Sequence, residues 1–244
     1  MQIRGSVALV TGANRGIGRA YVEALLARGA RKIYVGARRP DGIADLVAVD
    51  KATVQAIALD ITDAAAVASA AKACRDVTLL VNNAGINRAS GLVAAADISA
   101  ARAEMETNYF GTLAMCRTFA PVLKVNGGGA IINMLSILSR VSLPLMGSLC
   151  ASKAAGLSLT LGIRAELAGQ GTAVIAVMPG AVDTDMSRDF PPPKMPPREV
   201  AEAALSALEQ GLEEVYPGAM AAGIAQGLAA DPKAVEKQFA AYLP

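Results

Sequence analysis

Short, continuously apolar runs alternate with longer alanine-rich segments along the chain of 244 residues. Continuous apolar runs are typical of strands that are covered on both faces of a parallel sheet. We expect strands at 7–12, 32–37, 54–60, 78–85, 130–135, 172–178 and 213–218, and helices at 16–28, 63–75, about 97–123, about 147–169, 198–210 and 232–241. This order predicts one α/β domain over residues 1–244, with a doubly wound parallel sheet of about seven strands and helices on both faces.

Composition and charge restrict the classes of protein to which the chain can belong. Hydrophobic residues make up 53% and charged residues 18%, as in a folded globular chain. The formal net charge is +2 without a long basic cluster, which argues against a nucleic-acid partner. The first apolar run is too short for a secretory signal, and no apolar stretch reaches the ~20 residues that span a bilayer. We expect a cytoplasmic protein without a membrane partner.

The absence of histidine excludes several kinds of active site. The count is 0, so every Ser-His-Asp or Cys-His mechanism is excluded. The cysteines are odd in number and widely spaced, at Cys74, Cys116 and Cys150. Together these facts argue against a zinc site, and the sequence predicts no metal.

A glycine-rich stretch, VTGANRGIGRA, ends the first predicted strand and opens the first predicted helix. Gly12 permits a tight turn, Gly16 lets the backbone approach a pyrophosphate, and Gly18 brings the helix close to the strand. The amino terminus of the helix then faces the phosphates. The stretch predicts a dinucleotide-binding Rossmann fold.

The glycine spacing, T-G-x-x-x-G-x-G, resembles that of the short-chain dehydrogenase/reductase family, and the resemblance covers nearly the whole chain. Further matches follow in order: LDIT at 59–62, NNAG at 82–85, NYFG at 108–111, a serine at 136, a lysine at 153 and MPGAVDTDM at 178–186. The resemblance implies an oxidoreductase that binds a nicotinamide dinucleotide through Gly12, Asn14, Arg15, Gly16, Ile17, Gly18, Arg38, Arg39, Asp60, Ile61, Asn83, Ala84, Gly85, Lys153, Pro179, Gly180, Val182 and Thr184.

The end of the second predicted strand indicates which dinucleotide binds. A carboxylate at this position usually holds the free 2′-hydroxyl of NAD. Arg38 stands there with Arg39 beside it, and Arg15 lies on the same side of the ribose in members of the family. Guanidinium groups pair with a 2′-phosphate, so these cations predict NADP(H). Asp60 and Ile61 are expected at the adenine; a role in capping the strand end is the alternative for each.

The resemblance also implies a catalytic asparagine, serine, tyrosine and lysine. Asn108 would carry a water relay, Ser136 would orient the substrate oxygen, and Lys153 would bind the nicotinamide ribose and lower the pKa of the tyrosine. The tyrosine position holds Leu149, which has neither a proton nor a lone pair.

A neighbouring group could replace the missing hydroxyl. Cys150 lies about 100° further around the helix, so its sulfur should point away from the face of Lys153. Tyr109 could approach the nicotinamide from another side, although packing or a subunit interface is the alternative. Lys153 itself, or a water held by Ser136, could also supply the proton.

Three functions remain open. The chain is a reductase for substrates such as iminium ions, which need no strong proton donor, or a weak carbonyl reductase, since losing a positioned acid costs ~10²–10⁴-fold in rate. It could instead be an NADP-binding sensor or scaffold. The leucine could also have replaced a tyrosine by engineering.

The substrate pocket and the assembly are expected to be apolar. The pocket should be lined by Ile137, Leu138, Leu143, Leu145 and Leu149, beneath a Pro-rich loop at about 186–197 that either covers the substrate or is an ordinary connection. An apolar or aromatic carbonyl or imine suits such a pocket. In this family the helices that carry Asn108 and Lys153 pack against a partner subunit, and Leu161 and its neighbours fit that arrangement, so we expect a homodimer or homotetramer.

Overall fold

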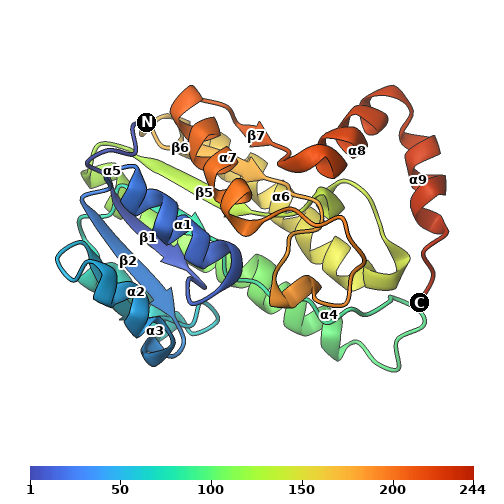
Figure 1. Cartoon of the computed structure of the whole chain (residues 1–244), viewed down its shortest axis with the longest axis horizontal. Helices are drawn as coiled ribbons and strands as arrows, with labels where there is room; N and C mark the ends of the chain where they lie inside the picture. Colours follow the sequence, from blue (N-terminus) through green and yellow to red (C-terminus); the bar gives the residue numbers. More distant parts are fainter.

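Seven parallel strands form one sheet in the computed structural model, which describes residues 1–244 apart from the side chains of residues 40 and 41. Their order is β3-β2-β1-β4-β5-β6-β7 (Figure 1). The strands are β1 Val7–Thr11, β2 Lys32–Ala37, β3 Val54–Ala58, β4 Leu79–Asn82, β5 Ala130–Met134, β6 Ala173–Val177 and β7 Glu214–Val215. The predicted doubly wound Rossmann fold is confirmed.

Helices cover both faces of the sheet. They are α1 Gly16–Ala27, α2 Ala44–Val49, α3 Ala64–Ala73, α4 Ser99–Glu104, α5 Thr112–Val125, α6 Gly147–Ala168, α7 Pro197–Gln210, α8 Gly218–Ala230 and α9 Pro232–Ala240. Single-turn helices η1 Pro40–Ile43, η3 Ile137–Ser139, η4 Pro144–Met146 and η5 Asp185–Ser187 lie in the connections, and a π-helical segment, η2 Met105–Gly111, joins α4 to α5.

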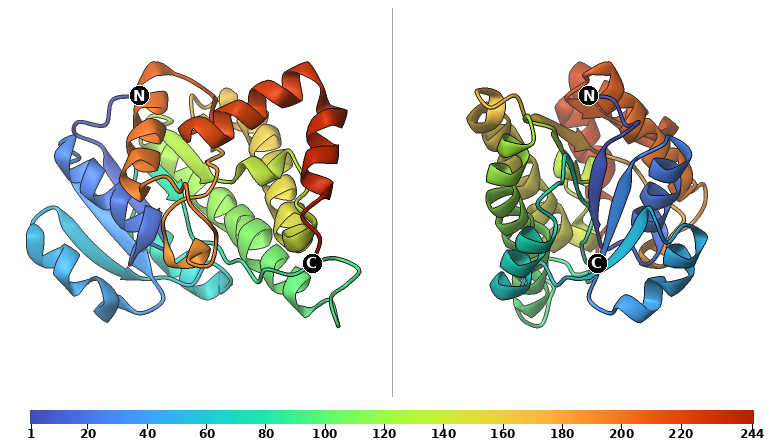
Figure 2. Two further views of the ribbon diagram at one scale, coloured as in Figure 1. Left: turned by 45° about the vertical axis from the view of Figure 1, so that its right-hand side comes forward. Right: turned by 90° about the vertical axis from the view of Figure 1, so that its left-hand side faces the viewer.

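The apolar strands explain why the core has two halves. Successive side chains of a strand point to opposite faces. In β1, Ala8 and Val10 pack with α1, α2 and α7, whereas Val7 and Leu9 pack on the other face with α3, α5 and α6. Both halves are needed to bury a strand that is apolar at every position, and Figure 2 shows the sheet between its two helical layers.

Local signals fix several helix ends. The Asp63 carboxylate accepts the backbone N–H groups of Ala65 and Ala66 and so caps α3. Asp231 caps α9 in the same way. Gly211 follows the last turn of α7 with a φ of 73°, a left-handed conformation that favours glycine.

The expected elements were wrong or incomplete in four places, and one of these is the short helix α2, which was not predicted. The helix expected at about 97–123 is divided by the π-helical segment η2, and the strand expected at 213–218 is only the two residues of β7. Helix α8 was not predicted, because Gly218, Gly223 and Gly227 interrupt its pattern and glycine is a poor helix former.

The carboxyl-terminal helices fold back beside α6 (Figures 1 and 2). Helix α8 packs against η3, and the Leu145 backbone N–H donates to the Tyr242 carbonyl at 3.0 Å. This arrangement brings α8 and α9 to the carboxyl ends of the central strands. Within the described residues, we find no helix with the length and apolar character needed to cross a membrane.

Candidate active site

A cavity of about 430 Å³ lies at the carboxyl ends of the strands, where the strand order reverses between β1 and β4. Ligands of open α/β sheets bind at this switch point, and the volume lies within the range of small-molecule sites. Its lining contains these residues of the predicted cofactor set: Gly12, Asn14, Arg15, Gly16, Ile17, Arg38, Asp60, Ile61, Asn83, Ala84, Gly85, Lys153, Pro179, Gly180, Val182 and Thr184.

The glycine loop forms a backbone cradle in this cavity. Gly12 and Gly16 have φ values of 62° and 54°, and a Cβ on Gly12 would lie 2.8 Å from the Cα of Ala84. Gly18 lies behind the lining, where a Cβ would collide with the carbonyl of Gly12. Helix α1 begins at Gly16 without a side-chain cap, so its first N–H groups remain available to an anion. The cradle therefore fits a dinucleotide pyrophosphate.

Hydrogen bonds between the ends of β1 and β4 hold the cradle in place. The Thr11 hydroxyl accepts the backbone N–H groups of Asn83 and Ala84, each at 3.0 Å. The Asn83 amide donates to the carbonyls of Thr11 and Gly12 at 3.0 and 3.1 Å. Asn83 thus shapes the loop through its side chain. Thr11 was not predicted as a site residue, although it is the threonine of the glycine motif.

Asp60 and Arg38 lie together where the adenosine is expected. Both line the cavity, whereas Arg39 is exposed outside the lining. The Asp60 carboxylate accepts the backbone N–H and the hydroxyl of Thr62, and these bonds, with a smaller effect of Arg38, hold the pKa of Asp60 below its usual value. Asp60 therefore does cap the strand end, and its contact with adenine stays a prediction. So does the role of Arg39 in phosphate binding.

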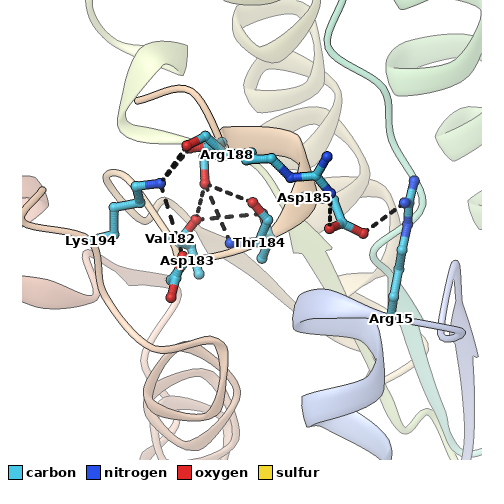
Figure 3. A network of polar contacts seen from close by, with 8 residues as sticks. Arg15, Val182, Asp183, Thr184, Asp185, Arg188 and Lys194 are labelled. Carbon is cyan, nitrogen blue, oxygen red and sulfur yellow. Dashed lines mark hydrogen bonds and ion pairs between the residues drawn. The ribbon is translucent and has the colours of Figure 1, made fainter. Parts of the chain in front are cut away.

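Arg15 forms an ion pair across the exposed rim of the cavity. Its Nη1 lies 2.8 Å from Oδ2 of Asp185, whose other oxygen accepts Arg188 Nη2 at 2.7 Å (Figure 3). The two arginines hold the pKa of Asp185 below its usual value. Lys194 Nζ donates to the backbone carbonyls of Ser187 and Arg188, at 2.7 and 3.1 Å. The pair links the glycine loop to the start of the predicted cover loop.

Three of the four predicted catalytic positions line the cavity: Ser136, Leu149 and Lys153. The Ser136 hydroxyl accepts the backbone N–H of Leu138 at 3.1 Å. Lys153 Nζ donates to the Met134 carbonyl at 2.9 Å. Leu149 lies one helical turn before Lys153 and is 6% exposed. The lining thus has a hydroxyl, an ammonium group and an apolar side chain where the resemblance implies a phenol.

Asn108 lies behind the cavity wall. It is buried in the π-helical segment, and its side-chain oxygen accepts the Ile86 N–H at 2.9 Å. Its amide donates to the Ile86 carbonyl and to the Ser152 hydroxyl, at 3.0 and 2.9 Å. A Cβ on Gly85 would lie 3.0 Å from Asn108 Oδ1 and 3.7 Å from Lys153 Nζ, so only glycine leaves the two side chains this close. Whether Asn108 holds a water stays a prediction.

The surroundings of Lys153 lower its affinity for a proton. Burial lowers the pKa of Lys153 to about 8, and the charge of Glu104 opposes the shift. A pKa lowered toward neutral pH is typical of groups that take part in proton transfer in active sites.

Of the alternative proton donors, Cys150 and Tyr109 do not face the cavity. The Cys150 sulfur accepts the Leu143 N–H at 3.2 Å, and burial raises the pKa of its thiol. This agrees with the prediction that the sulfur points away from Lys153. Tyr109 packs edge-to-face on Phe110, with ring centroids 5.0 Å apart, and belongs to the core beneath the sheet. Both are packing residues outside the lining.

The remaining part of the cavity is apolar. Ile137, Leu138, Leu143 and Leu149 line it as predicted, but Leu145 does not, because it is 40% exposed where η4 meets the carboxyl terminus. The lining also includes side chains that were not predicted: Met146, Met220, Ile224 and Phe239. Of the predicted cover loop, Met186, Ser187 and Phe190 reach the cavity, and a cover function for the whole segment stays a prediction.

Known proteins share both the sequence and the fold. The sequence profile described as short chain dehydrogenase matches residues 6–194. A crystal structure of a short chain dehydrogenase from Burkholderia cenocepacia in complex with NADP is 56% identical, with a TM-score of 0.93 over 98% of this chain and 99% of that chain. A short-chain dehydrogenase from Sphingobium yanoikuyae in complex with NADPH is 27% identical, with a TM-score of 0.79 over 93% and 95% of the two chains. An uncharacterized oxidoreductase of Staphylococcus saprophyticus is 32% identical over 86% of this chain and 94% of its own.

Proposed function

Because the chain belongs to the short-chain dehydrogenase family, we propose that it is an NADP(H)-dependent oxidoreductase that reduces an apolar or aromatic imine or carbonyl compound. The observation that carries the proposal is the composition of one cavity. Its cradle fits a pyrophosphate, its adenosine end contains Arg38 and Arg15, and its other end keeps Ser136 and Lys153 among apolar side chains.

Cation placement supports NADP(H) over NAD(H). Arg38 lies at the end of β2, where a carboxylate would repel a 2′-phosphate, and Arg15 lies at the start of α1 in the same lining. Charge-assisted hydrogen bonds from guanidinium groups to phosphate are among the strong ones in proteins. The structures of relatives in complex with NADP and NADPH support the same cofactor.

The residues around the reacting carbon support an imine more than a ketone. The cofactor, when bound, supplies a hydride. Ser136 can donate a hydrogen bond to a substrate oxygen or accept one from an iminium N–H, and Lys153 can hold the nicotinamide ribose. Leu149 can neither donate nor accept a proton, so an alkoxide formed by reduction of a ketone lacks a positioned acid. An iminium nitrogen already carries its proton before the hydride reaches the neighbouring carbon, so the neutral amine product forms without such an acid.

Matched substrate pairs test this function. The purified protein is mixed with NADPH and with cyclic imines and ketones of the same ring and substituents, and the loss of NADPH absorbance is followed. We expect turnover of the imine to exceed that of its ketone by ~10²-fold, the usual effect of a positioned acid. Equal turnover, or preference for the ketone, would contradict the proposed selectivity. Tight NADPH binding with no turnover across the panel would favour the alternative, an NADP-binding sensor or scaffold.

We also propose a homodimer or homotetramer. Phe110, beside α5, and Leu161, on α6, are 50% and 46% exposed although both are large and apolar. They lie on two segments that pack against each other, η2 and α6, and apolar and aromatic side chains are enriched at the core of protein interfaces. Size-exclusion chromatography with light scattering measures the mass of the assembly in solution. We expect Leu161→Glu to lower this mass to that of a single chain. A wild-type protein that elutes as a monomer would contradict this assembly.

A further inference from the structure

Glu104 is a fully buried acid one helical turn before Asn108. Its exposed fraction is 0%, and it ends α4, which packs against α6, the helix that carries Lys153. Its Oε1 accepts the Arg88 backbone N–H at 2.6 Å, and Asn108 makes the equivalent bond to Ile86. Both side chains therefore hold the segment that follows Gly85, beside the lysine.

The second carboxylate oxygen of Glu104 has no hydrogen-bond partner among the described side chains and backbone groups. A buried carboxylate with a single hydrogen bond is costly, and such groups are found where a nearby charge offsets the cost. The opposite charge on the facing helix is that of Lys153, whose ammonium group donates to the Met134 carbonyl and not to a carboxylate. The two groups therefore interact through the low-dielectric interior rather than through a direct ion pair.

The other charged side chains on the segments around Glu104 are exposed or lie further from Lys153. Arg102 and Glu106 lie on α4 and η2 at positions that are not buried, and the Arg88 side chain is exposed. Near Lys153 on α6 the next titratable group is Cys150, whose thiol has a raised pKa because it is buried. Arg164 and Glu166 lie about three turns further along the same helix. Glu104 is thus the charged group that acts on Lys153 from the protein side.

We propose that Glu104 is a positioning residue whose buried carboxylate, with one oxygen unpartnered among the described residues, stabilises the ammonium group of Lys153 across the contact between α4 and α6. The consequence rests on the proposed function, because a charged Lys153 attracts the anionic cofactor while it keeps its hydrogen bond to the Met134 carbonyl. Burial lowers the pKa of Lys153 to about 8, and the Glu104 charge opposes that shift. The other cations in the lining, Arg15 and Arg38, lie at its adenosine end, so Lys153 supplies the positive charge beside Ser136 and Leu149.

Lysine ¹³C resonances report the charge directly and need neither cofactor nor turnover. The ε-carbon of Lys153 is assigned with Lys153→Arg, and its titration midpoint is compared in wild type, Glu104→Gln, Glu104→Leu, Glu104→Asp and Glu106→Gln. We expect the midpoint to fall by about one pH unit in the Gln and Leu variants. It should stay near the wild-type value in Glu104→Asp, which keeps the charge, and in Glu106→Gln, which removes a more exposed acid two residues away. Glu104→Leu is included in case Glu104→Gln does not fold, because replacing a buried charge by an apolar side chain is often neutral or stabilising.

NADPH affinity is then measured against pH. With a midpoint one unit lower, Glu104→Gln should bind NADPH about fivefold more weakly than wild type at pH 8 and equally well at pH 6, since the charged fraction of Lys153 differs only at the higher pH. An unchanged Lys153 midpoint in a folded Gln or Leu variant overturns the proposal. A lowered midpoint with unchanged NADPH affinity supports the link between Glu104 and Lys153, and contradicts instead the part given to Lys153 in the proposed function.

Discussion

Arg15 and Asp185 are 170 positions apart in the chain, and their side chains meet at 2.8 Å on the rim of the cavity. Arg15 is also one of the cations expected to hold the 2′-phosphate of NADP(H). The same guanidinium group therefore has two anionic partners, one in the protein and one in the cofactor, and the cofactor must compete with Asp185 for it.

Removing the protein partner should favour the cofactor. In Asp185→Asn, Arg15 is free to pair with the phosphate, so NADPH should bind about two- to fivefold more tightly, the range expected from an exposed ion pair. NADH affinity should not change. The chain has no tryptophan, so the fluorescence of NADPH itself reports its binding. Asp189→Asn, an exposed acid on the same loop, is the control, and equal effects of both substitutions would exclude competition for Arg15.

Cofactor preference should depend on Arg38 more than on Arg39. Arg38 lines the cavity and Arg39 lies outside it. Arg38→Ala should weaken NADPH binding by about 10- to 100-fold, because a hydrogen bond to a charged group contributes about 1.5–3 kcal/mol, and should leave NADH binding nearly unchanged. Arg39→Ala should have a smaller effect. Titration of both variants with both cofactors decides between them; a larger effect of Arg39→Ala would mean that the loop after β2 rearranges on binding.

Phe239 links the carboxyl-terminal helix to the substrate end of the cavity. It lies in α9, and its ring is 6.2 Å from that of Tyr242. Phe239→Ala should raise the KM of an aromatic substrate by about tenfold or more through lost apolar contact, with little change in NADPH affinity. Phe110→Ala removes a phenylalanine outside the lining and should leave the KM unchanged. If both variants keep the wild-type KM, the substrate does not reach α9.

Stability should depend on pH through Lys153. Its folded pKa is about 8, below the ordinary value of 10.5. Between these values the unfolded chain binds more protons, so this group makes the folded state more stable as the pH rises through that window. Lys153→Met should therefore be more stable than wild type at pH 7, by about 1–3 kcal/mol.

The stabilising effect of Lys153→Met should shrink between pH 8 and 10.5 in urea unfolding without cofactor. Lys51→Met, at an exposed position, should give no such trend. A stability difference that stays constant over this window would mean that Lys153 titrates normally in the folded protein.

The sequence predicted the parts of the fold that depend on local pattern. Strands covered on both faces are apolar at most positions, as in β1, and the spacing of Gly12, Gly16 and Gly18 between a predicted strand and a predicted helix predicted the cradle. The prediction failed where contacts between distant segments decide the outcome. Helix α8 has a glycine-rich pattern that is weak by itself, and its Met220 packs against Gly180 of a distant segment, with Sδ 2.9 Å from where a Cβ would lie.

Side-chain burial was equally hard to predict from sequence. Leu145 and Leu149 look alike in an apolar stretch, but the carboxyl terminus holds the backbone of Leu145 and leaves its side chain exposed. Glu104 looks like any acid on a helix, and only the packing of α4 on α6 shows that it is buried. Its spacing of one helical turn from Asn108 was the one available signal.

The absence of a phenol at position 149 sets this cavity apart from the pattern that the family resemblance implies, and Leu149→Tyr tests its consequence most directly. The charge of Lys153 one turn away should lower the pKa of the new hydroxyl. Turnover of a small ketone with NADPH should then rise by ~10²-fold or more, while turnover of the matched imine should stay equal or fall. Leu149→Phe adds the ring without the hydroxyl and should give no gain, and Lys153→Ala added to Leu149→Tyr should abolish it. If Leu149→Tyr binds NADPH normally and its ketone turnover does not exceed that of Leu149→Phe, the cavity is not arranged as a reductase that lacks only its acid.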